Sequence, residues 1–233
     1  MKPVFYSYPI LIPRPNMRTD NEIRTGMQQF IRRAMELWQA AALIDAAEPG
    51  LLTASDREAA RRKGLAAGRR ILAECTKGNA KIAYFRALTG KSLYADPEIV
   101  QAMADRVWLL ENRYGLADSY LRAVSDTALQ KQAACILCPS PLRRDRLEAV
   151  FLPDCCAVFI SMSALEKPNE VIGHRVHLDR IPAADRKQAL REVLKENRRW
   201  VDALTQRAAE QLRNAEILRD LEADTCTADN PCL

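Results

Sequence analysis

Apolar positions near both ends of the chain recur every three or four residues, which is the spacing of amphipathic helices. The first of these segments begins at Asp20, a suitable N-cap residue, and stops before Pro49-Gly50. A second covers about residues 53–75, and the last runs from Pro182 towards Leu221. We therefore predict a helical bundle in which the N-terminal helices pack antiparallel to one long C-terminal helix.

Between these helices, short apolar runs alternate with segments of helical spacing. This alternation is typical of an α/β fold with a parallel sheet. The pattern predicts an arm and helices over residues 1–78, an α/β domain over 79–181, and a helix with a frayed tail over 182–233. The apolar runs expected to form strands lie at residues 81–88, 107–110, 133–137, 147–152, 157–162 and 171–178.

The run at residues 107–110 is followed by a short loop and a helix, which is the topology of a phosphate-binding loop. Such a loop needs the pattern G-x-x-x-x-G-K-[ST], because glycines let backbone N–H groups approach the phosphates and the lysine neutralises them. Here Asn112 and Ala117 stand at the glycine positions, and Asp118 stands at the lysine position. Ser119 alone keeps the residue type that the motif requires.

A carboxylate at the lysine position opposes phosphate binding. Two like charges about 4 Å apart repel by roughly 1 kcal/mol in water, and by several times that near a protein surface. A nucleotide-hydrolysing sheet also usually ends a second strand with an acid that helps to hold Mg²⁺, but this chain has Ser161 there. We interpret the loop, in which Gly115 remains, as a nucleotide-binding shape without its chemistry, and we expect no cofactor.

A second motif, Gly90-Lys91-Ser92, resembles the end of a phosphate loop. The first glycine of such a loop would stand five residues before Gly90, where the chain has Phe85. A plain turn is the favoured interpretation. The alternative is a weak ATPase or ATP-binding protein, with Mg²⁺, in which Lys91 or an arginine replaces the missing lysine and Ser92 belongs to the same anion site.

Arginine carries most of the formal net charge of +5 and is clustered in two stretches. One cluster follows a predicted strand, at the carboxyl edge of the sheet where α/β proteins usually bind ligands, so it is an alternative anion site. Clustered cations also allow nucleic-acid binding, which is our second alternative function. The clusters are Arg61-Arg62-Lys63 with Arg69-Arg70, and Arg143 and Arg144 with Arg146.

The chain has seven cysteines, an odd number in a chain large enough to fold without disulfides, so we expect free thiols and a reducing cytoplasm. Cys135 and Cys138 have C-x-x-C spacing, and His174 and His177 are also three residues apart, which raises a zinc site as an alternative. Residues three apart on a strand point to opposite faces, however. Buried, inert cysteines are the favoured interpretation, and we expect no metal.

The composition, 48% hydrophobic and 28% charged over 233 residues, is ordinary for a soluble protein of one or two domains. Its apolar runs are shorter than the roughly 20 residues that a membrane helix needs. Prolines interrupt the apolar stretch within residues 1–17, which we interpret as an extended arm or a poorly ordered terminus and not as a signal peptide. We therefore expect no membrane association.

Two stretches, RVWLLENRYGLADSYL and CPSPLRRDRLEAVFLPDCCAVFISMS, resemble one half of a bacterial P-loop ATPase-like family whose chains contain two related NTPase-like halves. In that family the first half carries an intact phosphate loop. The second half is typically degenerate, with a C-P-x-x-P-like segment and an I-P-E-L-like segment, which Cys138-Pro139 with Pro141 and Leu152-Pro153-Asp154 resemble. The resemblance covers roughly residues 80–221 and implies a sheet of P-loop NTPase type.

These observations lead to the hypothesis of a non-catalytic interaction or regulatory protein with a degenerate phosphate loop. No nucleophile has a general base that the sequence places beside it, so we predict no catalytic residue. The expected partner is a protein, either an intact NTPase or a second copy of the chain.

Overall fold

The computed structural model of the chain describes residues 20–46, 52–74, 78–83 and 97–228. The predictions for the arm at residues 1–17, for most of the strand at 81–88, and for Lys91 and Ser92 concern residues outside this set. Within it the chain forms a six-stranded sheet and five α-helices, so the α/β class is confirmed. No helix in this part of the chain has a segment long and apolar enough to cross a lipid bilayer.

The sheet is mixed. Its strands are β1 (Ala80–Ile82), β2 (Arg106–Leu110), β3 (Cys135–Pro139), β4 (Leu147–Leu152), β5 (Ala157–Ser161) and β6 (His174–Val176). They lie in the order β1-β3-β4-β5-β2-β6. β2 runs parallel to both of its neighbours, β5 and β6, whereas β4 runs antiparallel to both β3 and β5.

The prediction of a parallel sheet is therefore wrong at β4. Only residues 140–146 connect β3 to β4, and only residues 153–156 connect β4 to β5. A parallel crossover needs about a dozen residues or more, so connections this short force neighbouring strands to run in opposite directions. The finer assignment to the P-loop NTPase type stays a prediction.

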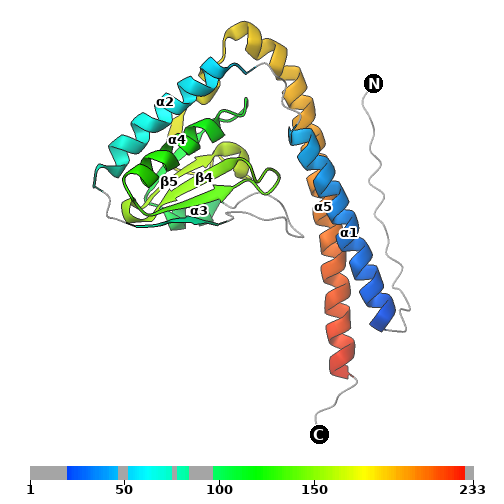
Figure 1. Cartoon of the computed structure of the whole chain (residues 1–233). Coiled ribbons are helices and arrows are strands. Elements are labelled where there is room, and N and C mark those ends of the chain that lie inside the picture. Colours follow the sequence, from blue (N-terminus) through cyan, green and yellow to red (C-terminus); the bar gives the residue numbers. More distant parts are fainter. Residues whose placement is uncertain (1–19, 47–51, 75–77, 84–96, 229–233) are drawn as a thin grey trace.

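Helices cover both faces of the sheet, as Figure 1 shows. α4 (Ala117–Gln130) lies over one face with α2 (Ala54–Ile71) packed against it, and α3 (Pro97–Met103) lies on the other. Successive strand residues alternate between the two cores, as the two-residue period of a strand requires. Trp108 and Phe159 stack in the core beneath α4 with their ring centroids 4.8 Å apart, whereas Val107 and Val158 belong to the core on the α3 side.

The start of α2 and its contact with α4 follow from the local sequence. Thr53 caps the helix, because its side chain accepts from the Asp56 N–H while the Asp56 carboxylate accepts from the Thr53 N–H. Gly64 and Gly68 face α4, and a Cβ at Gly64 would collide with the backbone oxygen of Tyr120. These glycines let α2 lie close to α4, so α2 belongs to the α/β domain and not to the helical bundle.

The bundle consists of α1 (Asp20–Ala46) and α5 (Ala184–Ala228), which form a long pair that projects from the α/β domain (Figure 1). The pair is antiparallel, because Arg24 Nε lies 2.6 Å from Glu222 Oε1 near the opposite helix ends. Small residues let the helices approach closely, and the buried alanines are Ala34, Ala41, Ala208, Ala209 and Ala215. α5 continues to Ala228, so the prediction of a frayed tail from residue 224 is wrong over these residues.

Short 3-10 helices complete the described chain. They are η1 (Leu72–Glu74), η2 (Pro153–Cys155), η3 (Met162–Ala164) and η4 (Leu178–Arg180). η3 follows the inner strand β5 and η4 follows the edge strand β6, so both lie beyond the carboxyl ends of strands. This is the edge at which the candidate site is found.

Candidate functional site

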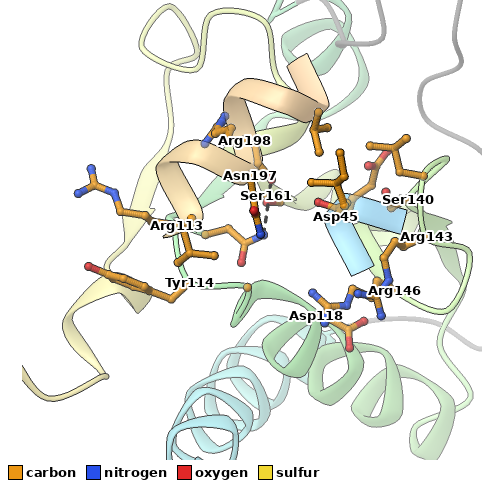
Figure 2. A pocket seen from close by; sticks show the side chains of 18 of the residues that line it. Asp45, Arg113, Tyr114, Asp118, Ser140, Arg143, Arg146, Ser161, Asn197 and Arg198 are labelled. Atoms are coloured by element: carbon orange, nitrogen blue, oxygen red, sulfur yellow. Dashed lines mark hydrogen bonds between the residues drawn. The ribbon is translucent and has the colours of Figure 1, made fainter. Parts of the chain in front are cut away.

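A cleft of ≈ 200 Å³ lies where β2, β3 and β5 end, between the α/β domain and the helix pair (Figure 2). Its walls are the loop after β2, the hairpin between β3 and β4, the end of β5, and parts of α1 and α5. Ligand-binding sites for drug-sized molecules usually have volumes of about 300–1,000 Å³, so this cleft suits a smaller molecule. The predicted site residues that line it are Asn112, Gly115, Asp118, Arg143 and Arg146, whereas Ser119 and Arg144 do not.

The loop after β2 is closed upon itself. Asn112 Oδ1 accepts a hydrogen bond of 2.9 Å from the N–H of Ala117, the first residue of α4, and so replaces a capping residue. The Gly115 N–H donates to the Asn112 carbonyl at 3.4 Å, and Gly115 has a φ of 78°, which only glycine adopts without strain. The Arg113 N–H donates to Asp179 Oδ1 at 2.9 Å.

These contacts decide what the loop can bind. A phosphate cradle works by aiming several backbone N–H groups at one anion. Here the N–H groups of Arg113, Gly115 and Ala117 donate to acceptors of the protein itself. The loop joins a strand to a helix, as a cradle does, but these three donors are engaged within the fold.

Asp118, at the lysine position of the motif, anchors the neighbouring hairpin. Its Oδ1 accepts a 2.8 Å hydrogen bond from the N–H of Leu147, the first residue of β4. Arg122, one turn later on α4, donates from Nε to both carboxylate oxygens at 3.1 and 3.0 Å. Arg122 Nη2 also donates to the carbonyl of Asp145. The carboxylate is thus partly buried and occupied by protein donors.

Ser161 occupies the end of β5, where a nucleotide-hydrolysing sheet would carry an acid. It is 1% exposed, and its Oγ lies 2.8 Å from Ser163 Oγ. Asn112 Nδ2 donates to Ser163 Oγ over 3.5 Å, so a polar chain joins the end of β5 to the loop after β2. Hydroxyl groups in this chain can hold a polar ligand, but they lack the charge that Mg²⁺ binding favours.

The arginine cluster between β3 and β4 is divided in its roles. Arg143 Nη2 lies 2.8 Å from Asp145 Oδ2, and this hydrogen bond holds the pKa of Asp145 below its ordinary value. Arg143 and Arg146 line the cleft, and Arg144 is exposed. The edge position predicted from the sequence is correct, because the hairpin begins at the carboxyl end of β3.

Glu148 is a cleft residue that the sequence analysis missed. The pairing of β3 with β4 slips at this point, since Cys138 lies opposite Ala149 and Pro139 lies opposite Leu147. Glu148 is the extra residue of this bulge, lines the cleft and is 4% exposed. Bulges re-aim side chains in this way, and the single acid within the apolar run LEAVFL was the signal that could have found it.

The charges that line the cleft are balanced. Four arginines face four acidic residues, so the described lining has no cationic excess for a polyphosphate. Asn197 and Arg198 belong to this lining and interrupt the apolar stripe of α5 between Leu194 and Val201, a signal that the sequence analysis passed over. The charged lining residues are Arg113, Arg143, Arg146, Arg198, Asp45, Asp118, Glu148 and Asp202.

A second polar group holds β6 and η4 against the loop. His177 Nδ1 lies 2.9 Å from Glu111 Oε1, and Asp179 accepts from the Arg113 N–H. Burial raises the pKa of Asp179, and the negative charge of Glu111 adds to this, although the bond from Arg113 acts in the opposite direction. This group fixes the outer side of the loop after β2.

The thiols and histidines do not form the zinc site considered above. β3 and β6 are four strand positions apart, which is about 19 Å at the usual spacing between strands, so Cys135 and Cys138 cannot share a metal with His174 and His177. The two cysteines lie in different cores, on opposite faces of the sheet. No group of three or more His, Cys, Asp or Glu side chains in the described residues is placed to hold a metal ion.

The environments of Cys135 and Cys138 match the prediction that these two cysteines are inert, but the prediction that all thiols are free fails at one residue. Burial raises the pKa of Cys135, and burial together with the charge of Glu148 raises that of Cys138 to about 12. Cys135, Cys138 and Cys156 are free, but Cys155 is disulfide-bonded, so the prediction of free thiols is wrong there. An odd number of cysteines does not exclude a disulfide bond, and the number alone does not show which cysteines form it.

Comparisons with known proteins found no matching family model, no matching curated protein and no matching solved structure. The resemblance to a P-loop ATPase-like family therefore stays a prediction that rests on the residues quoted for it.

Proposed function

We propose that this protein is a non-catalytic interaction or regulatory protein of P-loop NTPase type whose phosphate loop has become a structural element. One observation carries the proposal. The backbone donors of Arg113, Gly115 and Ala117 are bonded within the fold, while the acid at the lysine position, Asp118, anchors β4. A triphosphate at this loop would have to break these bonds and face a carboxylate.

The volume and charge of the cleft support the same proposal. It is smaller than the usual site for a ligand of nucleotide size, and its arginines are matched by acids. We keep the cytoplasm as the proposed compartment, which the free thiols of Cys135, Cys138 and Cys156 favour and the disulfide bond of Cys155 opposes. A nucleotide is not part of the proposed function.

Calorimetric titration with Mg-ATP tests the non-catalytic part of the proposal. We expect no measurable heat of binding and no phosphate release above that of buffer. Micromolar binding that disappears in Ser119→Ala would overturn the proposal, because Ser119 is the residue of the motif that would hold Mg²⁺.

The interaction surface that we propose is α1, with a second copy of the chain as the partner. Ile31 and Met35 are 40% and 57% exposed, and they share one helix face with half-buried Trp38. Two copies packed antiparallel about Met35 would place Ile31 of each against Trp38 of the other, so the pattern is self-complementary. Apolar side chains gathered on one face in this way are typical of an interaction site.

Sedimentation equilibrium tests this surface. We expect self-association of the wild-type chain that Met35→Glu abolishes, because the new charge would be buried in the contact. Gln29→Glu adds the same charge at an exposed position of α1 that points away from Ile31 and Met35, and it is the control, with association expected to be unchanged. A monomer at all accessible concentrations would exclude the second copy as the partner.

A further inference from the structure

The outward face of α2 carries a dense group of cations that the cleft does not use. The helix sequence, ASDREAARRKGLAAGRRI, contains six Lys and Arg residues and two acids. One of the acids, Asp56, is 4% exposed and ion-paired with Arg186, so it does not offset the surface charge. The other, Glu58, lies 3.8 Å from Arg61. We call Arg61, Arg62, Lys63, Arg69 and Arg70, all exposed, the basic face.

The basic face belongs to a rigid part of the molecule. The residues of α2 that point into the protein recur at the helical period and include Ala60, Gly64 and Gly68. Arg62 and Arg69 are two turns apart and lie opposite this buried side. α2 packs on α4 on the side away from the sheet (Figure 1), so the cations are displayed outward on a fixed helix.

The chemistry of the basic face favours phosphate groups. Four of its five members are arginines, whose planar guanidinium groups bind phosphate oxygens through two parallel hydrogen bonds, whereas a lysine acts as a point charge. None of the large exposed hydrophobic residues of the described chain lies on α2. A helix that lies on a membrane needs such residues to enter the lipid, so a lipid surface is disfavoured.

The residue types on α2 favour a duplex over a single strand. Proteins that hold single strands stack successive bases on aromatic side chains, but α2 has no aromatic residue. A helix that displays cations without stacking groups is suited to the phosphate backbone of a duplex, and contacts to phosphate carry no sequence information directly. We infer that the basic face of α2 binds the backbone of double-stranded nucleic acid without sequence preference.

Fluorescence anisotropy with a labelled DNA duplex of about 20 base pairs tests this inference. Backbone binding of this kind usually has a dissociation constant of about 1–100 µM at physiological salt, and each neutralised phosphate contributes about 0.9 to the slope of log K against log salt. We expect Arg62→Ala with Arg69→Ala to reduce the slope by about 1.8 and to weaken binding at low salt by at least about tenfold.

Two charge-reversal variants with the same net charge distinguish binding at the basic face from attraction to the net charge of the chain. Arg62→Glu with Arg69→Glu is expected to abolish duplex binding, whereas Arg32→Glu with Arg33→Glu, at exposed positions of α1, is expected to retain most of it. All four positions are exposed, so circular dichroism should confirm that both variants fold. The inference is overturned if the two reversals weaken binding equally or if the wild-type chain does not bind the duplex. It is also overturned if the chain prefers single strands, polyglutamate or phosphatidylserine vesicles to the duplex.

Discussion

The carboxylate of Asp118 accepts a hydrogen bond from the backbone N–H of Leu147, with the two atoms 2.8 Å apart, and so ties the first turn of α4 to the first residue of β4. Arg122 completes the junction by donating both to this carboxylate and to the Asp145 carbonyl. The residue that departs most from a phosphate-loop motif is therefore the residue that joins a helix to a neighbouring hairpin.

Asp118→Ala should destabilise the protein. The change leaves the Leu147 N–H and the Arg122 guanidinium without their acceptor, and hydrogen bonds to charged groups are worth about 1.5–3 kcal/mol. Urea unfolding measures the loss. Asp126→Ala on the same helix is the control and should change the free energy of unfolding by less than about 0.5 kcal/mol. An equally small change for Asp118→Ala would mean that the junction contributes little.

Gly64→Ala should also destabilise the protein, although alanine favours helices. Alanine gains about 1 kcal/mol over glycine inside an exposed helix, but a Cβ at Gly64 would collide with the Tyr120 carbonyl oxygen, and overpacking of this kind costs typically about 1–3 kcal/mol. We expect a lower melting temperature. Ala66→Gly, at an exposed position of α2, is the control, because it measures only the difference in helix propensity between alanine and glycine. A stabilised Gly64→Ala variant would show that α2 and α4 are not in close contact.

The stability conferred by Asp56 should depend on pH. Burial alone would raise the pKa of this carboxyl, but hydrogen bonds from Thr53 and Arg186 outweigh it and hold the pKa below its ordinary value. The ionised group therefore stabilises the fold above about pH 4, and this contribution is lost as the pH falls through the lowered pKa.

Asp56→Asn isolates this effect. The variant should be less stable than the wild type at pH 7 by about 1–3 kcal/mol, and the difference should shrink in acid below about pH 4. Urea unfolding at several pH values measures both quantities. Glu58→Gln removes an exposed carboxylate from the same turn and should show almost no such trend. A difference for Asp56→Asn that is the same at pH 3 and pH 7 would contradict the argument.

The elements could be predicted from local sequence, and their arrangement only in part. Helical spacing located α1 and α5, and it located α2 within the segment predicted at about residues 53–75. The direction of β4 was missed although the signal was present, because the short connections on either side of it exclude a parallel crossover.

The chemistry of the site was harder to predict. Comparison with the motif placed Asp118 at the loop, but its bond to Leu147 joins residues 29 positions apart and depends on how α4 meets the hairpin. The capping role of Asn112 likewise arises from the path of the loop, which a single residue does not encode, whereas the acid within the apolar run of β4 was a local sign of the bulge at Glu148.

Urea unfolding with and without about 5 mM Mg-ATP tests the central claim most directly, with magnesium sulfate at matched ionic strength as the reference. A ligand present at about 100 times its dissociation constant stabilises the native state by about 2.7 kcal/mol. We predict that the two unfolding curves superimpose, because the loop from Asn112 to Asp118 is closed by its own hydrogen bonds. A rise of about 2.7 kcal/mol in the free energy of unfolding would mean that the loop opens to receive the nucleotide, and would contradict the account.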